Sequence, residues 1–453
     1  HMEEPEEKAL EQEPIEEIPT EIKPRWWPAI IISACLAVVL TTIWSGSGDN
    51  QQEQVLKTGG VLIISFVLLT IWALIFSRFS KQLRLRILFS LIGAFALFGA
   101  CFRFDQVSGN MVPIFEWRWA KRSLPEVADD GQSSSSTGLD SNSTQFSFPQ
   151  FLGPTRDCKT PGPKLIADWE SNPPEQMWRQ DIGAAWSGFV VSANRAITQE
   201  QRGENEIVSC YDLLTGKMLW MHSNPGRYDT KIAGEGPRAT PTIHEKNVYA
   251  LGATGILNCL ELETGKPVWQ RNIASDAGLE NDDEVDQTGA SKKRNKAKEW
   301  GYSSSPLILE GKVIVSAGGE SGKSLLAYNL DSGEPVWSGG NSRAGYSSAH
   351  TATIHGEEQV LIFNQEELTA HAPETGSVIW SFEWKVGVPH VSMPVILNDN
   401  QILLSLGYGQ GSKLVQVTKS EESYSANELW SSRFMKAKFT NLVSHEGHIY
   451  GLD

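Results

Sequence analysis

CYDLLTGKMLW (residues 210–220) decides the fold of this chain, because it recurs in three variants: CLELETGKPVW (259–269), AYNLDSGEPVW (327–337) and AHAPETGSVIW (370–380). The glycine allows a positive φ in a hairpin turn, and the Thr or Ser before it can hydrogen-bond the turn backbone. The closing tryptophan buries a large surface, and we expect a neighbouring tryptophan to pack over the small opening Ala or Cys. The structural positions of this motif are Gly216, Gly265, Gly333, Gly376, Trp220, Trp269, Trp337 and Trp380.

Two alternating apolar runs with turn residues between them precede each segment, as in TPTIHEKNVYALGATGILNCLEL (240–262). Such alternation predicts four antiparallel strands in each unit. Apart from one longer gap, the tryptophans recur at roughly 42 to 50 residues, which is the period of a propeller blade. We therefore predict an all-β propeller of four-stranded antiparallel blades.

The pattern resembles the tryptophan-docking motif of pyrroloquinoline-quinone (PQQ) type propellers, over residues 148–453. That family includes quinoprotein alcohol dehydrogenase-like proteins and the propeller lipoprotein of the outer-membrane barrel assembly machinery. The chain departs from the motif at Ala372, which replaces an acidic residue, and in a fifth unit, LVQVTKSEESYSANELW (414–430), where the turn is longer. The resemblance implies a repeat protein with this fold, and it is shared by enzymes and binding proteins.

About five complete blades are expected, if the segment 177–182 around Trp178 supplies the closing strand that this family usually takes from its N-terminus. KFTNLVSHEGHIYGLD (438–453) then begins another blade with two strands. Propellers of the resembling family close with about seven or eight blades. We therefore interpret the chain as a form truncated at its C-terminus.

Three uncharged apolar stretches lie ahead of the propeller, at about 26–44, 59–76 and 87–102. Each is near the ~20 residues that a helix needs to cross a bilayer, and tryptophans lie at or near several of their ends. Residues 25–104 are therefore predicted to form an anchor of three transmembrane helices. The membrane is the first partner that the sequence indicates.

Charge predicts the orientation of this anchor. The connection 77–86 carries four basic residues, whereas the connection 45–58 carries only Lys57 against two acidic residues. Positively charged loops stay in the cytoplasm. The prediction is a multi-pass protein of the cytoplasmic (inner) membrane, with its N-terminus inside and its propeller outside, in the periplasm.

Three further segments have the composition of unfolded chain. Residues 1–24 are rich in Glu and Pro and are predicted to be a disordered acidic cytoplasmic tail. Residues 105–147 are predicted to be a juxtamembrane segment and a Ser-rich linker. Residues 276–298 insert an acidic block and a basic block between the second and third motifs, which is typical of a solvated charged loop.

Composition disfavours several functions. A formal net charge of −15 would repel nucleic acid, so no nucleic-acid partner is expected. The five cysteines include no C-x-x-C pair, and no metal site is predicted. Cys210 and Cys259 are instead interpreted as small buried apolar groups.

A cofactor site, if there is one, would be built where inner strands begin. Arg238, His350 and His390 occupy such positions and are the candidate cofactor-binding residues at the channel mouth. In the resembling quinoproteins PQQ lies near one mouth, with calcium held by carboxylate and amide oxygens. No cofactor is expected, with PQQ and calcium as the alternative. Catalytic residues are unknown.

Two functions remain after these steps. The first is a membrane-anchored extracytoplasmic module that binds envelope proteins or acts as a scaffold. The alternative is a PQQ-dependent quinoprotein dehydrogenase that oxidises an alcohol or sugar and passes electrons to the membrane. A third hypothesis is a sensor whose acidic cytoplasmic tail signals that a ligand has bound on the outer side of the membrane. The motifs explain folding and none of them requires redox chemistry, so the first is favoured.

Overall fold

The computed structural model describes residues 24–45, 51–108, 112–120, 147–160, 162, 164–230, 232–279, 300–421 and 423–452. The chain divides into two compact units, His1–Ala120 and Lys121–Asp453. The predicted acidic tail (1–24) lies outside the described residues except for its last residue. Most of the predicted linker (105–147) and of the charged insertion (276–298) also lies outside them.

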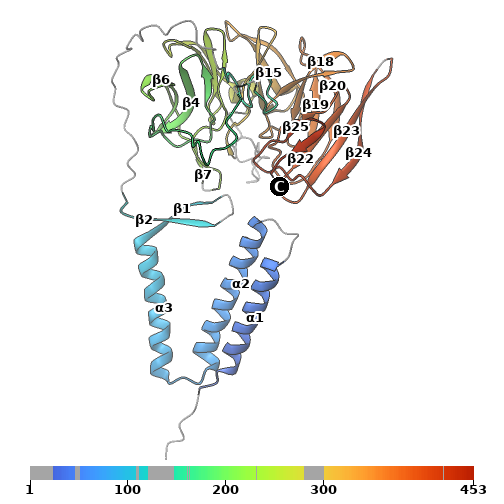
Figure 1. The fold of residues 1–453 in the computed structure, drawn as a ribbon. Coiled ribbons are helices and arrows are strands. Elements are labelled where there is room, and N and C mark those ends of the chain that lie inside the picture. The colour runs from blue at the N-terminus through green and yellow to red at the C-terminus, as the bar shows by residue number, and fades with distance from the viewer. Residues whose placement is uncertain are drawn as a thin grey trace, which may run out of the picture. The chain divides into compact units, whose positions relative to one another are not determined.

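Three long apolar helices make up most of the first unit: α1 (Trp27–Ser45), α2 (Gln51–Ile71) and α3 (Lys81–Cys101) (Figure 1). A π-helix, η1 (Trp72–Phe76), continues α2. All three are long and apolar enough to cross a membrane, which confirms the predicted helices. α3 starts earlier than expected because Ser80 caps it, accepting a hydrogen bond from Leu83 N at 3.3 Å.

An antiparallel hairpin follows α3 directly: β1 (Phe102–Val107) pairs with β2 (Pro113–Trp117). This hairpin was not predicted from the sequence. Its strands are five or six residues long, too short for their alternation to stand out beside a long apolar helix.

Among the described residues the second unit holds five four-stranded antiparallel sheets, each formed by strands that are consecutive in the chain (Figure 1). They confirm the predicted blades. The first two are β3 (Val190–Ser192), β4 (Arg195–Arg202), β5 (Asn205–Asp212) and β6 (Met218–Pro225), and β9 (Thr242–His244), β10 (Asn247–Leu251), β11 (Ile256–Glu261) and β12 (Pro267–Asn272).

The third blade is β13 (Leu307–Leu309), β14 (Lys312–Gly319), β15 (Lys323–Asn329) and β16 (Pro335–Gly339). The fourth is β17 (His350–Ile354), β18 (Glu357–Phe363), β19 (Glu367–His371) and β20 (Val378–Glu383). The fifth is β21 (Val395–Ile396), β22 (Gln401–Leu406), β23 (Gly411–Lys419) and β24 (Tyr424–Ser432). Smaller elements are β7 (Asp229–Thr230), β8 (Gly234–Glu235), α4 (Ile273–Ala277), β25 (Val443–His445) and β26 (His448–Tyr450). The innermost strands β3, β9 and β13 contact one another in turn.

Three of the closing tryptophans, Trp220, Trp269 and Trp337, join their blade to the next. Trp220 Nε1 donates to the Leu262 carbonyl at 3.0 Å, and its ring lies over Gly265, where a Cβ would be 2.4 Å from Trp220 Cε3. The same contact joins Trp178, Trp269 and Trp337 to Gly216, Gly333 and Gly376. In the strand register Cys210 lies opposite Trp220 of its own blade, and the neighbouring ring lies over the glycine. Packing of a neighbouring tryptophan over the small Ala or Cys stays a prediction.

Two tryptophans differ from the expected pattern. Trp178 docks like the others, but residues 177–182 form no strand, so the expected closing strand is not found there. Trp380 donates to Gln359 Oε1 within its own blade, at 2.8 Å.

The same β-bulge occurs in all five sheets. In the first blade Cys210 pairs with Trp220 and Tyr211 with Met218, which leaves Leu219 as the extra residue. The other four sheets shift register at the corresponding place. A bulge bends its strand and redirects the side chains beside it, so we infer that it helps to aim Trp220, Trp269 and Trp337 at the next blade.

Candidate functional site

A segment from the beginning of the second unit runs along the inner strands of the propeller. Phe148 and Val191 of β3 exchange two backbone hydrogen bonds of 2.8 Å, and Ile243 N of β9 donates to the Pro149 carbonyl at 2.7 Å. Arg156 then donates to the carbonyls of Ser305 and Pro306, just before β13. Residues 147–160, here called the inner segment, thus link three consecutive blades. This role could not be predicted from the sequence, because the segment has no periodicity.

Arg156 is the most deeply buried charged group of the inner segment, at 3% exposure. Its Nη1 lies 2.9 Å from the Pro306 carbonyl and its Nη2 lies 3.1 Å from the Ser305 carbonyl. Burial lowers the pKa of this guanidinium to about 9. Arg156 has a positive φ of 55°, and so do Leu152 and Cys158, which winds the segment tightly across the strands.

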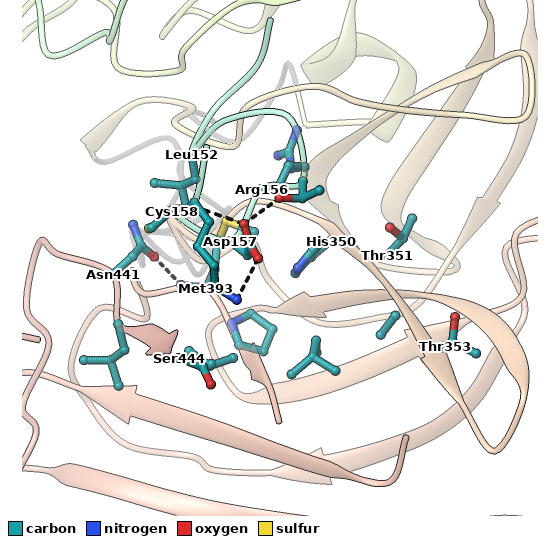
Figure 2. A pocket seen from close by; sticks show the side chains of 17 residues that line it. Leu152, Arg156, Asp157, Cys158, His350, Thr351, Thr353, Met393, Asn441 and Ser444 are labelled. Atoms are coloured by element: carbon teal, nitrogen blue, oxygen red, sulfur yellow. Dashed lines mark hydrogen bonds and ion pairs between the residues drawn. The ribbon is translucent and has the colours of Figure 1, made fainter. Parts of the chain in front are cut away.

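The inner segment borders a cavity of about 260 Å³. The opposite walls come from β17, from the residues around β21, and from the approach to β25 (Figure 2). The polar side chains that line the cavity are Thr155, Arg156, Asp157, Cys158, Lys159, His350, Thr351, Thr353, Asn441 and Ser444. Figure 2 shows the ring of His350 directed toward Asp157. The cavity therefore joins the inner segment to the fourth and fifth four-stranded blades and to the two-stranded sheet β25–β26.

Burial and charge determine the chemistry of this cavity. Burial and the charge of Arg156 lower the pKa of His350 to about 4, against an opposing effect of Asp157. Partial burial would raise the pKa of Asp157, but hydrogen bonds from Thr155 and Lys159 hold it below its usual value. Burial and the Asp157 charge raise the pKa of the Cys158 thiol. At neutral pH the cavity thus presents a neutral imidazole, a carboxylate and a protonated thiol, which is not an activated nucleophile.

His350 should make the stability of the propeller depend on pH. Its imidazole stays neutral in the folded state down to about pH 4, whereas in the unfolded chain it binds a proton near pH 6.5. Between these values the unfolded state binds more protons, so stability falls as pH falls. Between pH 7 and pH 5 the free energy of unfolding should fall by about 2 kcal/mol less in His350→Asn than in wild type. Urea unfolding midpoints of the solubilised chain at both pH values measure this effect. The same change at exposed His445 is the control, and equal pH dependence in both variants would refute the assignment.

Arg238 is held within its own loop. Its Nη1 donates to the Gly236 carbonyl at 2.6 Å, and its Nη2 donates to the carbonyls of Ala233 and Gly234 at 2.7 and 3.1 Å. Its guanidinium carbon lies 4.6 Å from the ring centroid of Tyr228. These contacts hold the small β7–β8 hairpin in one conformation.

His390 is fully buried and packs on Phe363, with ring centroids 4.4 Å apart. Its carbonyl accepts a hydrogen bond from Tyr346 N at 2.7 Å. Of the three predicted cofactor-binding residues, only His350 lines the cavity, and Arg238 and His390 do not. A cofactor role for the three stays a prediction.

A further buried carboxylate, Glu206, was missed from the sequence. It accepts hydrogen bonds from Ala253 N at 2.7 Å and from Thr254 N at 3.3 Å, and so fixes a turn of the second blade to the first. Burial raises its pKa despite these bonds. Among the described residues no three His, Cys, Asp or Glu side chains gather to hold a metal ion.

The connections that lead into the inner strands also expose aromatic side chains. Trp186, ahead of β3, is 67% exposed, and Phe434 and Phe439, ahead of β25, are 74% and 62% exposed. Lys438 lies 4.8 Å from the ring centroid of Tyr408 beside them. We call Trp186, Phe434 and Phe439 the mouth aromatics. Large exposed apolar side chains of this kind are common in protein-binding surfaces.

Comparison with known proteins places the second unit in a family. The family model described as outer membrane protein assembly factor BamB matches residues 160–299 and 287–452. The BamB protein of Moranella endobia (strain PCIT) is 29% identical over 149 residues, which cover 29% of this chain and 38% of that protein. The match therefore spans well under two thirds of that relative.

Solved structures include BamB from Moraxella catarrhalis, with 14% identity, coverage of 57% of this chain and 76% of that chain, and a TM-score of 0.30. Quinohemoprotein alcohol dehydrogenase from Comamonas testosteroni has 15% identity, coverage of 63% and 49%, and a TM-score of 0.40. At these values the likeness adds nothing to the fold described above.

Proposed function

The chain belongs to the PQQ-repeat family described as outer membrane protein assembly factor BamB, and on that basis we propose that it is a protein-binding or scaffold module of the cell envelope. The three apolar helices support a membrane anchor. The four basic residues of the connection 77–86 support a propeller on the periplasmic side of the inner membrane. Its partners are then envelope proteins. The name of the relative, an outer membrane protein assembly factor, supports this class of partner.

The exposure of the mouth aromatics is the observation that carries the proposal beyond family membership. Arg238, Glu206 and the backbone of His390 make hydrogen bonds within the propeller itself. The mouth aromatics, which lie on the connections into β3 and β25, instead remain in solvent. Burying such rings in a partner contributes more to binding than most other surface contacts do.

Photo-crosslinking in intact envelopes tests this proposal. A photoreactive residue replaces Phe439 in the full-length chain, and the matched control replaces Leu214, which is 50% exposed in the docking turn of the first blade. We expect a discrete adduct with an envelope protein from position 439 and little from position 214. Adding Trp186→Ala should reduce the adduct about 5- to 30-fold, the effect of losing roughly 1–2 kcal/mol of contact energy.

Two outcomes would contradict the proposal. Equal labelling from positions 439 and 214 would show that the mouth aromatics do not form a binding surface. Stoichiometric binding of PQQ with calcium, together with dye reduction over alcohols or sugars, would replace the scaffold with the quinoprotein dehydrogenase alternative.

A further inference from the structure

The hairpin after α3 has one aromatic face and one charged face. Phe102 pairs with Trp117 and Phe104 pairs with Phe115 across the two strands. Between them Arg103 pairs with Glu116, and their side chains form an ion pair of 2.8 Å. Because side chains alternate between the faces of a strand, the four rings lie on one side and the ion pair lies on the other.

The rings of this face contact one another and the last turns of α3. Ring centroids of Phe98 lie 5.0 Å from those of both Phe102 and Phe115. Trp117 lies 5.2 Å from Phe102 and 5.2 Å from Trp119. We call Phe102, Phe104, Phe115, Trp117 and Trp119 the aromatic face. It continues the apolar surface of the helix without interruption.

Arg118 fixes the hairpin to the end of the helix. Its backbone N donates to the Cys101 carbonyl at 2.7 Å, and its Nη2 donates to the Gly99 carbonyl at 2.8 Å. β1 begins at Phe102, directly after the last residue of α3. The aromatic face therefore stays at the level where α3 ends.

This face is exposed although it is apolar. Phe104, Phe115 and Trp117 are 43%, 46% and 47% exposed, and Trp119 is 63% exposed. An isolated two-stranded hairpin is marginally stable in water, so exposed rings of this size favour an apolar covering layer. Tryptophan and other amphipathic rings favour the interface between lipid and water, and Arg118 can reach lipid phosphates there.

We propose that the hairpin lies in the lipid–water interface at the Cys101 end of α3, with its aromatic face toward the acyl chains and the Arg103–Glu116 pair toward water. The inference rests on the proposed membrane anchor. The lipid surface is the occupant because the face is continuous with α3, which is apolar and long enough to span. The hairpin would fix the depth of α3 and begin the link to the propeller on the membrane surface.

Spin labels on the full chain in nanodiscs of phosphatidylcholine and phosphatidylglycerol test this inference. Cys35, Cys101 and Cys158 are replaced by serine, the buried Cys210 and Cys259 are kept, and one accessible cysteine is introduced as Phe115→Cys, Phe104→Cys or Glu116→Cys. Ile92→Cys reports on the interior of α3. The measurement is the accessibility of each label to oxygen, which concentrates in lipid, relative to a water-soluble nickel chelate.

We expect the oxygen-to-nickel ratio at 115 and 104 to be several-fold above that at 116, and the ratio at 92 to be the highest. A water-like ratio at 115 and 104 with a lipid-like ratio at 92 would overturn the hairpin inference and leave the anchor standing. Water-like ratios at all positions would overturn both. Shielding of 115 and 104 from both reagents would show a protein cover, from the propeller or a second copy, and would also overturn it.

Discussion

Replacing Gly265 with alanine should lower the free energy of unfolding of the propeller by about 2–5 kcal/mol. The residue has a φ of +69°, a conformation that costs an L-residue roughly 1–2 kcal/mol. The added Cβ would also lie 2.4 Å from Trp220 Cε3. Trp220 cannot move aside without losing its hydrogen bond to the Leu262 carbonyl and its burial between two blades.

Gly311→Ala is the matched control for this prediction. Gly311 has a φ of +71°, and a Cβ there would meet no heavy atom within 4 Å. It should therefore cost only the backbone strain, about 1–2 kcal/mol. Urea unfolding of the solubilised full chain, followed by tryptophan fluorescence, gives both values. An equal loss in the two variants would mean that docking by Trp220 contributes nothing to the need for glycine at 265.

The docking turn shows how far sequence alone could go. Gly265 and Trp220 each stand in a recurring motif, so the turn and the blades were predictable. The residue beneath the Trp220 ring could not be predicted, because its identity depends on a one-residue bulge at Leu219 and on the rotation between neighbouring blades. Neither leaves a pattern in the sequence.

The candidate site was less predictable for the same reason. His350 was found because it begins an inner strand, but Asp157, which lines the same cavity, comes from a segment almost two hundred residues earlier that has no periodicity. Arg156 was missed because a buried arginine whose partners are backbone carbonyls leaves no acidic partner to recognise in the sequence. Long-range pairings of this kind are set by topology rather than by local composition.

Glu200→Ala should lower the free energy of unfolding by about 3–5 kcal/mol at neutral pH. Glu200 is fully buried in β4 and accepts hydrogen bonds from Arg202 at 3.0 Å, from Tyr211 at 2.8 Å, and from Gly183 N. Removing the carboxylate leaves the Arg202 charge buried at 9% exposure without its counter-ion. It also frees the segment that follows Trp178, so the first docking contact should loosen as well.

Glu428→Ala is the control, because Glu428 pairs with Lys413 at 2.7 Å on the surface of the fifth blade, where an ion pair contributes less than about 1 kcal/mol.

The pH dependence of the stability difference separates the effect of the Glu200 charge from that of its packing. Burial alone would raise the pKa of Glu200, but the bonds from Arg202, Gly183 and Tyr211 outweigh it and hold the pKa below its usual value of 4.5. The unfolded chain therefore takes up this proton first as pH falls, and the stability from Glu200 is present above pH 4.5 and lost as pH falls through the folded pKa. The gap between wild type and Glu200→Ala should stay constant from pH 7 to pH 5.5 and narrow below pH 4.5. A gap that does not narrow would show that Glu200 contributes through packing rather than through its charge.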